Sequence, residues 1–172
     1  HKIMARDNKK FGGKREKPEF DQKLLDLARV ARVVKGGRRF RFRATLVIGN
    51  RRGKVGVGVG KGADVSDAIR KAFDDAKKNM VTIKMSKNTI VHDIKYKSRS
   101  AKIILRPAAE GRGIIAGGAV RTVVEFAGIK DIISKSLGTS NKLSVARATV
   151  EALSSLAQAR TRKERIGMAE SN

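Results

Sequence analysis

Eleven Lys and Arg side chains lie within thirty-three residues, from Arg29 to Lys61, without a single Asp or Glu among them. Their ammonium and guanidinium groups bind phosphate, and a guanidinium can donate two parallel hydrogen bonds to it. A surface that needs only solubility mixes both signs of charge. A run of one sign therefore predicts an anionic partner, while a charged but inert surface is the alternative interpretation.

The partner that this pattern favours is a folded RNA. Over residues 39–48 basic and apolar residues alternate, so a strand places Arg39, Arg41 and Arg43 in a row on one face. Aromatic residues are only 4% of the chain, whereas recognition of single-stranded bases depends on aromatic side chains. We therefore expect recognition of phosphates and of shape, with paired arginines at two turns reaching the RNA.

Other kinds of chemistry find little support. The two histidines are His1 and His92, and no Ser has a recognisable base partner, so catalysis is not expected. There is no Cys and no cluster of metal ligands. A P-loop that ends at Lys61 would need Gly where Val55 stands and Ser or Thr where Gly62 stands. The sequence therefore predicts no enzyme, no metal and no cofactor.

The composition limits the class of protein further. The chain has 172 residues, with 40 Lys plus Arg against 16 Asp plus Glu, which gives a formal charge of +24. Such a chain repels itself, and phosphates relieve this repulsion when counterions leave the nucleic acid. Hydrophobic residues make up 40%, enough for an aliphatic core. No apolar run reaches about eighteen residues, so no membrane span is expected.

The first half is expected to form three antiparallel strands covered by one helix. The elements are strands over residues 24–34, 39–48 and 54–61 and a helix from residue 65 to about 80. The alternation slips near Leu27 and Ala28, where we expect a β-bulge. Phe40 and Phe42 are expected to face the core. The alternate glycines of residues 56–60 are expected to face away from it, where another backbone or a ligand can approach closely.

The second half is expected to form β-β-α-β-α. Its elements are strands over 90–96, 100–106 and 129–137, a short helix that ends at Gly128, and a longer helix over 143–159. A Gly-rich loop over 110–118 precedes the short helix. The turn at 86–89 is the candidate domain boundary. The expected organisation is a flexible basic tail (1–20), an N-terminal RNA-binding domain (21–85), a C-terminal α/β domain (86–159) and a C-terminal tail (160–172).

Five segments carry a resemblance to a known family. In chain order they read VVKGGRRF, GVGVGKG, AKKNM at the end of the first helix, RPAAEGRGIIAGGAVRTVVEFAGIKD and GTSNKLSVARATVEAL. Their order and spacing, over residues 24–159, resemble the family of bacterial-type small-ribosomal-subunit protein five. The resemblance implies an α+β fold of two domains. The N-terminal β-β-β-α domain would be similar to a double-stranded-RNA-binding domain, and the C-terminal domain would be the β-β-α-β-α unit.

The resemblance also implies a function. In the family the protein is a structural constituent of the small ribosomal subunit, in the bacterial cytoplasm or in an organelle. It binds 16S ribosomal RNA at the neck of the subunit, near the decoding site and the path by which messenger RNA enters. The loop over 32–39 would enter the ribosomal RNA. The residues expected to bind it are Arg29, Arg32, Lys35, Gly36, Gly37, Arg38, Arg39, Arg41, Arg43, Arg51, Arg52, Lys54 and Lys61.

Two protein partners are implied as well. In the family the segment that corresponds to 110–121 faces small-subunit protein four, at an interface whose opening affects decoding accuracy, and the C-terminal region meets small-subunit protein eight. The interface residues expected here are Glu110, Arg112, Gly113, Gly117, Gly118 and Arg121. One segment departs from the family, because Arg51 and Arg52 stand where it is often acidic or neutral. The alternative function is that of a free RNA chaperone or annealing factor.

Overall fold

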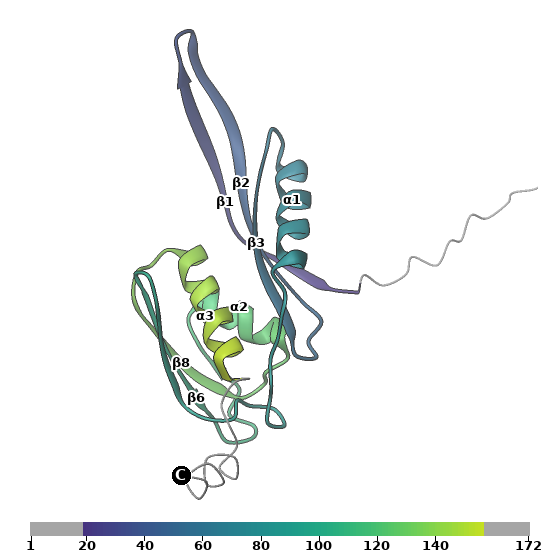
Figure 1. The fold of residues 1–172 in the computed structure, drawn as a ribbon, viewed down its shortest axis with the longest axis vertical. Coiled ribbons are helices and arrows are strands. Elements are labelled where there is room, and N and C mark those ends of the chain that lie inside the picture. The colour runs from purple at the N-terminus through teal and green to yellow at the C-terminus, as the bar shows by residue number, and fades with distance from the viewer. Residues whose placement is uncertain (1–18, 157–172) are drawn as a thin grey trace, which may run out of the picture.

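The computed structural model describes residues 19–156, which form two four-stranded sheets and three helices (Figure 1). The elements of the first half are β1 (Asp21–Val34), β2 (Gly37–Gly49), β3 (Lys54–Gly62), α1 (Val65–Lys78) and β4 (Val81–Thr82). Those of the second half are β5 (Ile94–Ser98), β6 (Ala101–Pro107), β7 (Ile114–Ile115), α2 (Gly118–Ala127), β8 (Ile132–Gly138) and α3 (Lys142–Leu156). The predictions for residues 1–18 and for 157–172, including the end of the last helix, lie outside the described residues.

The predicted α+β class is confirmed, and two strands of two residues each, β4 and β7, add to the six longer strands given above. The sheet orders are β1-β2-β3-β4 and β5-β6-β8-β7. The additional strand β7 lies within the Gly-rich loop and pairs in parallel with β8; two residues are too few to show a pattern in the sequence. Strand β5 begins at Ile94 rather than at residue 90, because Ile90 is buried in the core from a loop. Strand β8 likewise begins at Ile132 rather than at residue 129.

Strands β1 and β2 form one long antiparallel hairpin that contains a β-bulge. The register shifts between Leu24 and Asp26, which corrects the expected position near Leu27 and Ala28. The extra residue is Leu25, and its side chain packs against the core of the second half. Because the Leu25 side chain is packed in this way, the β-bulge lies nearer the start of β1 than the alternation of apolar and polar residues suggested.

The outer part of this hairpin extends beyond the rest of the molecule, and we define it as the arm, residues 29–43 (Figure 1). Phe42 still packs against the core under α1, but Phe40 is 47% exposed. The expectation that Phe40 faces the core was therefore wrong, because the strands continue past the end of the helix. The guanidinium of Arg29 lies 3.8 Å from the centre of the Phe40 ring, a cation–π contact that partly shields the ring.

Helix α1 covers the glycine face of β3, which corrects the expectation that this face lies away from the core. The buried side of the helix carries Ala68, Ala72 and Ala76. A Cβ added at Gly58 would meet the carbonyl oxygen of Ala72 and the backbone nitrogen of Ala76. Glycine in the strand and alanine in the helix therefore let the two backbones approach each other closely. The close approach was predicted, but its partner is this helix rather than a ligand.

The opposite face of the first sheet packs against the second half of the chain. Val47, Val55 and Val57 are buried in one core together with side chains of α2 and α3. Strands β2 and β3 are thus covered on both faces, by α1 on one side and by α2 and α3 on the other (Figure 1). We define this covered part, residues 44–60, as the base of the first sheet.

A turn of the first half holds the end of a helix of the second. In the turn between β2 and β3, the backbone N–H of Arg51 donates to the carbonyl of Phe126 (3.0 Å), and that of Gly53 donates to Ala127 (2.8 Å). Carbonyls in the last turn of a helix lack helical partners. Helix α2 ends at Gly128, which has φ +94°, and a Cβ there would meet the carbonyl oxygen of Arg51. We refer to this contact as the joint.

Candidate nucleic-acid interface

One face of the arm carries a row of cationic side chains. The strand register places Arg32 opposite Arg39 and Arg43 opposite Lys61, with Arg41 between them on the same face. We define these five residues as the cationic row. Because residues of one face are two apart, the arginines of β2 follow each other at about 7 Å along the strand. None of the five forms an ion pair with a residue that the structure describes.

Four members of the cationic row, Arg32, Arg39, Arg41 and Lys61, line a hollow of about 500 Å³, to which Val30 and Val34 contribute apolar walls. The Nε of Arg43 is buried, and within residues 19–156 it has no hydrogen-bond partner. A buried donor without a partner costs about 1–3 kcal/mol. A phosphate in the hollow would neutralise the four cationic side chains that line it. The arm is therefore suited to bind an anion of high charge density.

The tip of the arm is open. Lys35 and Arg38 are exposed, and a Cβ added at Gly36 or Gly37 would meet no heavy atom within 4 Å. Gly37 has φ +142°, a backbone conformation that side-chain-bearing residues rarely adopt, so the reversal of the chain depends on glycine at this position. A narrow tip that turns on two glycines and carries exposed cations on either side can enter a groove that a helix would not fit.

The second pair of arginines has different surroundings from the first. The Nε of Arg51 donates a hydrogen bond to Asp21 (2.8 Å), and its guanidinium lies 3.6 Å from a carboxylate oxygen of Glu125 and 5.0 Å from the centre of the Phe126 ring. The hydrogen bond to Asp21 is the main reason why the pKa of Arg51 is raised above its ordinary value. All three basic residues of this turn, 51, 52 and 54, are exposed, but of the three only Arg51 forms ion pairs with described residues, and these engage it at the joint.

The residues expected to face a protein form one segment of the second half. Glu110 and Arg112 are exposed in the turn before β7, and Arg121 is exposed in the first turn of α2. The expected glycines 117 and 118 are exposed where that helix begins. Gly113 has φ +77°, and its backbone N–H donates to the buried carboxylate of Asp131 (2.8 Å). A buried carboxylate therefore fixes the shape of an otherwise exposed loop.

Sequence reasoning missed two cationic residues that the fold brings to one place. Arg99 lies in the turn between β5 and β6, and Arg147 lies on α3, and both line a pocket between the first sheet and the second half. Arg147 is isolated among apolar and small residues in the sequence, so no charge run marks it. Arg99 had two local signals, the alternating Lys95 and Lys97 that precede it and its place in a two-residue turn between strands, where glycine or asparagine is preferred.

The described residues, 19–156, contain no helix that is both long and apolar enough to cross a membrane. In the same part of the chain, no group of three or more His, Asp or Glu side chains is arranged to hold a metal ion. A two-domain α+β fold that presents unpaired cations along a projecting arm is characteristic of proteins that bind nucleic acids.

Sequence comparison identifies the family within this class. Residues 20–84 match the family profile of ribosomal protein S5, N-terminal domain, and residues 96–165 match that of ribosomal protein S5, C-terminal domain. The small ribosomal subunit protein uS5 of Campylobacter jejuni, in strains 81-176, 81116 and RM1221, is 54% identical over 143 residues, which cover 83% of this chain and 97% of each relative. The chain belongs to the ribosomal protein S5 family.

This membership confirms the resemblance that the five segments indicated. It also confirms the interpretation of the chain as a structural protein rather than an enzyme, since the family consists of ribosomal proteins. The first profile covers the sheet with the arm and α1, and the second covers most of the β5-β6-β8-β7 sheet with its two helices. The exact domain boundary, at residues 86–89, stays a prediction.

Proposed function

We propose that the protein is a structural constituent of the small ribosomal subunit in the cytoplasm and binds 16S ribosomal RNA through its arm. The observation that carries the proposal is the cationic row, whose five side chains form no ion pair with any described residue. RNA phosphates would neutralise the row, and the counterions released from the RNA would drive binding. The name of the relatives, small ribosomal subunit protein, supports the subunit as the place of binding.

The proposed position of the arm is the neck of the subunit, near the decoding site and the path of incoming messenger RNA. Two features support insertion of the arm into folded RNA. The tip is narrow and built from Gly36 and Gly37, and the arm projects beyond the body (Figure 1). The chain has few aromatic residues, so recognition would rest on phosphates and shape rather than on stacking with single-stranded bases.

The second half is proposed to contact two proteins, small-subunit protein four through residues 110–121 and small-subunit protein eight through the C-terminal region. Ile115, on the short edge strand β7, is 48% exposed, and the charged residues Glu110 and Arg112 lie nearby in the sequence. An apolar centre with a polar rim is the usual composition of a protein interface. In this proposal the contact with protein four opens and closes during decoding and thereby influences accuracy.

The proposal of a subunit constituent is tested by sedimentation, because a free RNA chaperone or annealing factor would use the same cationic row. The full chain is expected to migrate with small subunits through a density gradient at moderate salt, at about one copy per subunit. A variant in which Arg32, Arg39 and Arg41 are replaced by Gln should be released at lower salt than the parent chain. Recovery of the parent chain only at the top of the gradient would favour the chaperone.

The proposed contact with protein four has its own test. Arg121→Leu removes an exposed charge from the first turn of α2 and is expected to change decoding accuracy more than assembly. Accuracy is measured with a stop-codon readthrough reporter, and assembly is measured as the amount of small subunits in the same cells. Readthrough at the parent level together with a loss of small subunits would contradict this role of the segment.

A further inference from the structure

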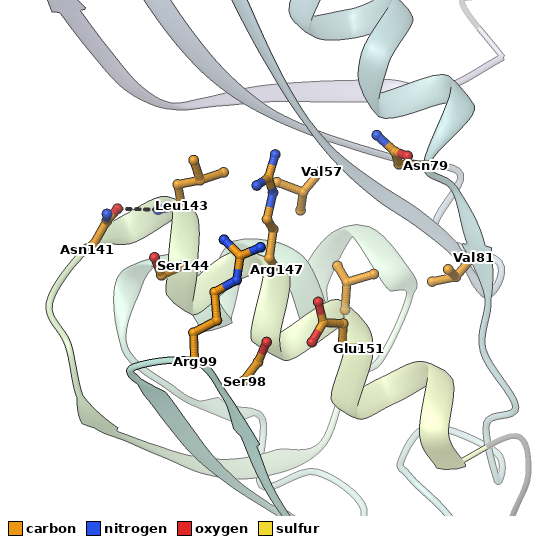
Figure 2. A pocket seen from close by; sticks show the side chains of 11 residues that line it. Val57, Asn79, Val81, Ser98, Arg99, Asn141, Leu143, Ser144, Arg147 and Glu151 are labelled. Carbon is orange, nitrogen blue, oxygen red and sulfur yellow. Dashed lines mark hydrogen bonds between the residues drawn. The ribbon is translucent and has the colours of Figure 1, made fainter.

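A pocket of about 590 Å³ lies between the first sheet and the second half of the chain (Figure 2). One wall is the base of the first sheet, represented by Val57 of β3. The other wall combines the turn between β5 and β6 with the first turns of α3. The cationic row lies elsewhere, on the arm, and the segment expected to face a protein is not part of this pocket. The pocket is therefore separate from both of the binding regions proposed above, and its ligand is a further question.

Two arginines from different elements point into this pocket. Figure 2 shows the side chain of Arg99 reaching in from the turn between β5 and β6 and that of Arg147 reaching in from α3. Neither forms an ion pair with any residue that the structure describes. Two guanidiniums that face one pocket repel each other, and an anion between them would turn this repulsion into attraction. Guanidinium pairs are well matched to phosphate, which they bind through several parallel hydrogen bonds.

The backbone holds Arg99 at the pocket in an unfavourable conformation. Arg99 has φ +52° and is the first of two residues between the paired Ser98 and Ala101. Glycine or asparagine is preferred at such a position. The turn is fixed from the other side, because the backbone N–H of Thr139 donates to Ser100 (3.2 Å). Strained residues of this kind are typical of functional sites, and here the strain places a guanidinium beside the start of α3.

Neutral donors complete the pocket. The side-chain oxygen of Asn141 accepts a hydrogen bond from the backbone N–H of Leu143 (3.1 Å), so that its amide N–H groups are left to donate (Figure 2). The hydroxyl of Ser144 lines the same wall. The positive end of the α3 dipole adds to the field of the arginines. Glu151 is the one acid that lines the pocket, and it forms no ion pair within residues 19–156.

The pocket lies on the same face of the first sheet as the cationic row. Val57 is paired with Val47, and Arg43 precedes Val47 by four residues on the same strand and face. Four residues of a strand span about 13 Å. The sheet wall of the pocket and the cationic row thus lie on one face of the first sheet, about four residues apart along the strand, a spacing that a short stretch of folded RNA can bridge.

We propose that this pocket binds a backbone phosphate of the RNA that the arm contacts, with Arg99 and Arg147 as the two charged ligands and Asn141 and Ser144 as neutral donors. The inference rests on the proposed binding of 16S ribosomal RNA and adds a second contact to it. A phosphodiester is favoured over the carboxylate of a neighbouring protein, because the two arginines lie on the face that continues into the cationic row.

The experiment measures the affinity of the full chain for 16S ribosomal RNA over a series of salt concentrations. Arg147→Gln and Arg99→Asn each remove one charge, and asparagine tolerates the positive φ of position 99. Because the two arginines share one phosphate, each variant is expected to reduce the slope of log affinity against log salt by part of one unit, and the pair by about one unit. Glu151→Gln, which removes the acid from the same pocket, is expected to raise the affinity.

Controls separate this inference from the function on which it rests. Arg147→Lys keeps the charge and should keep the slope while it lowers the affinity, and circular dichroism establishes that each variant is folded. Arg39→Ala, on the arm, is measured in parallel. A normal slope for the pocket variants together with a reduced slope for Arg39→Ala would overturn the pocket and leave the proposed function intact. Normal slopes for both sets would overturn both.

Discussion

The arm and the base of the first sheet are built from the same strands, yet their surroundings are opposite. In the arm, the cationic row forms no ion pair with described residues and Phe40 is exposed. In the base, α1 covers one face and the second half of the chain covers the other. The comparison teaches that a charge pattern signals a binding site only where packing leaves the charges without partners.

The two turns at the ends of β2 repeat this contrast. One pair of adjacent arginines follows the first turn, and another pair lies in the second turn. From the sequence alone, both pairs are therefore equally good candidates for RNA binding. At the tip of the arm, Arg38 and Arg39 are exposed. At the joint, Arg51 bonds to Asp21, a residue thirty positions earlier in the chain. One pair is therefore available to a partner, while half of the other pair is used to hold the molecule together.

The largest effect should come from a side chain placed between the base and α1. Gly58→Leu puts a Cβ against the backbone of Ala72 and Ala76, neither of which can move without displacing the helix. We expect a loss of unfolding free energy of about 4 kcal/mol or more, which is exceptional for one substitution. The measurement is denaturant unfolding followed by circular dichroism.

The same substitution in the arm is the matched control. In Gly36→Leu the added Cβ meets no heavy atom within 4 Å, so the unfolding free energy should change by no more than about 0.5 kcal/mol. Equal losses at Gly36 and Gly58 would break the contrast between an open arm and a covered base.

A smaller effect is expected at the joint. Gly128→Ala forces a side chain into φ +94° and brings its Cβ against the carbonyl of Arg51. Gly111→Ala imposes a similar backbone conformation, φ +85°, with no atom within 4 Å. Backbone strain alone costs about 1–2 kcal/mol. Gly128→Ala should cost about 1–3 kcal/mol more than Gly111→Ala in denaturant unfolding, because the collision adds to the strain. Equal costs would show that the joint contributes nothing.

Features that depend on a few neighbouring residues could be predicted from the sequence. Alternation predicted the three main strands of the first sheet and placed Arg39, Arg41 and Arg43 on one face, as the register confirms. The short helix α2 was also predicted, and Gly128 ends it as expected. The cationic row was accessible to the same reasoning because its members lie close together in the chain.

Features that depend on distant partners could not be predicted. The alternation of side chains along a strand shows that Phe40 and Phe42 share a face. It does not show that α1 covers this face at Phe42 and no longer at Phe40. The role of Arg51 depends on Asp21 and Glu125, which belong to other elements. The pocket of Arg99 and Arg147 combines segments nearly fifty residues apart, and no local pattern marks their meeting.

The smallest expected effects on stability come from replacing one arginine of the arm and one of the joint. These two variants test most directly the claim that the arm binds RNA and that the second turn holds the molecule together. The affinity of the full chain for 16S ribosomal RNA is measured against salt for Arg39→Ala and for Arg51→Ala. Arg39→Ala is expected to reduce the slope by about one unit and to leave the unfolding free energy within about 0.5 kcal/mol of the parent. Arg51→Ala is expected to keep the slope and to lower the unfolding free energy by up to about 1 kcal/mol, the scale of an exposed ion pair. The reverse result, an unchanged slope for Arg39→Ala and a reduced one for Arg51→Ala, would contradict the assignment of the arm to RNA and of the second turn to the joint.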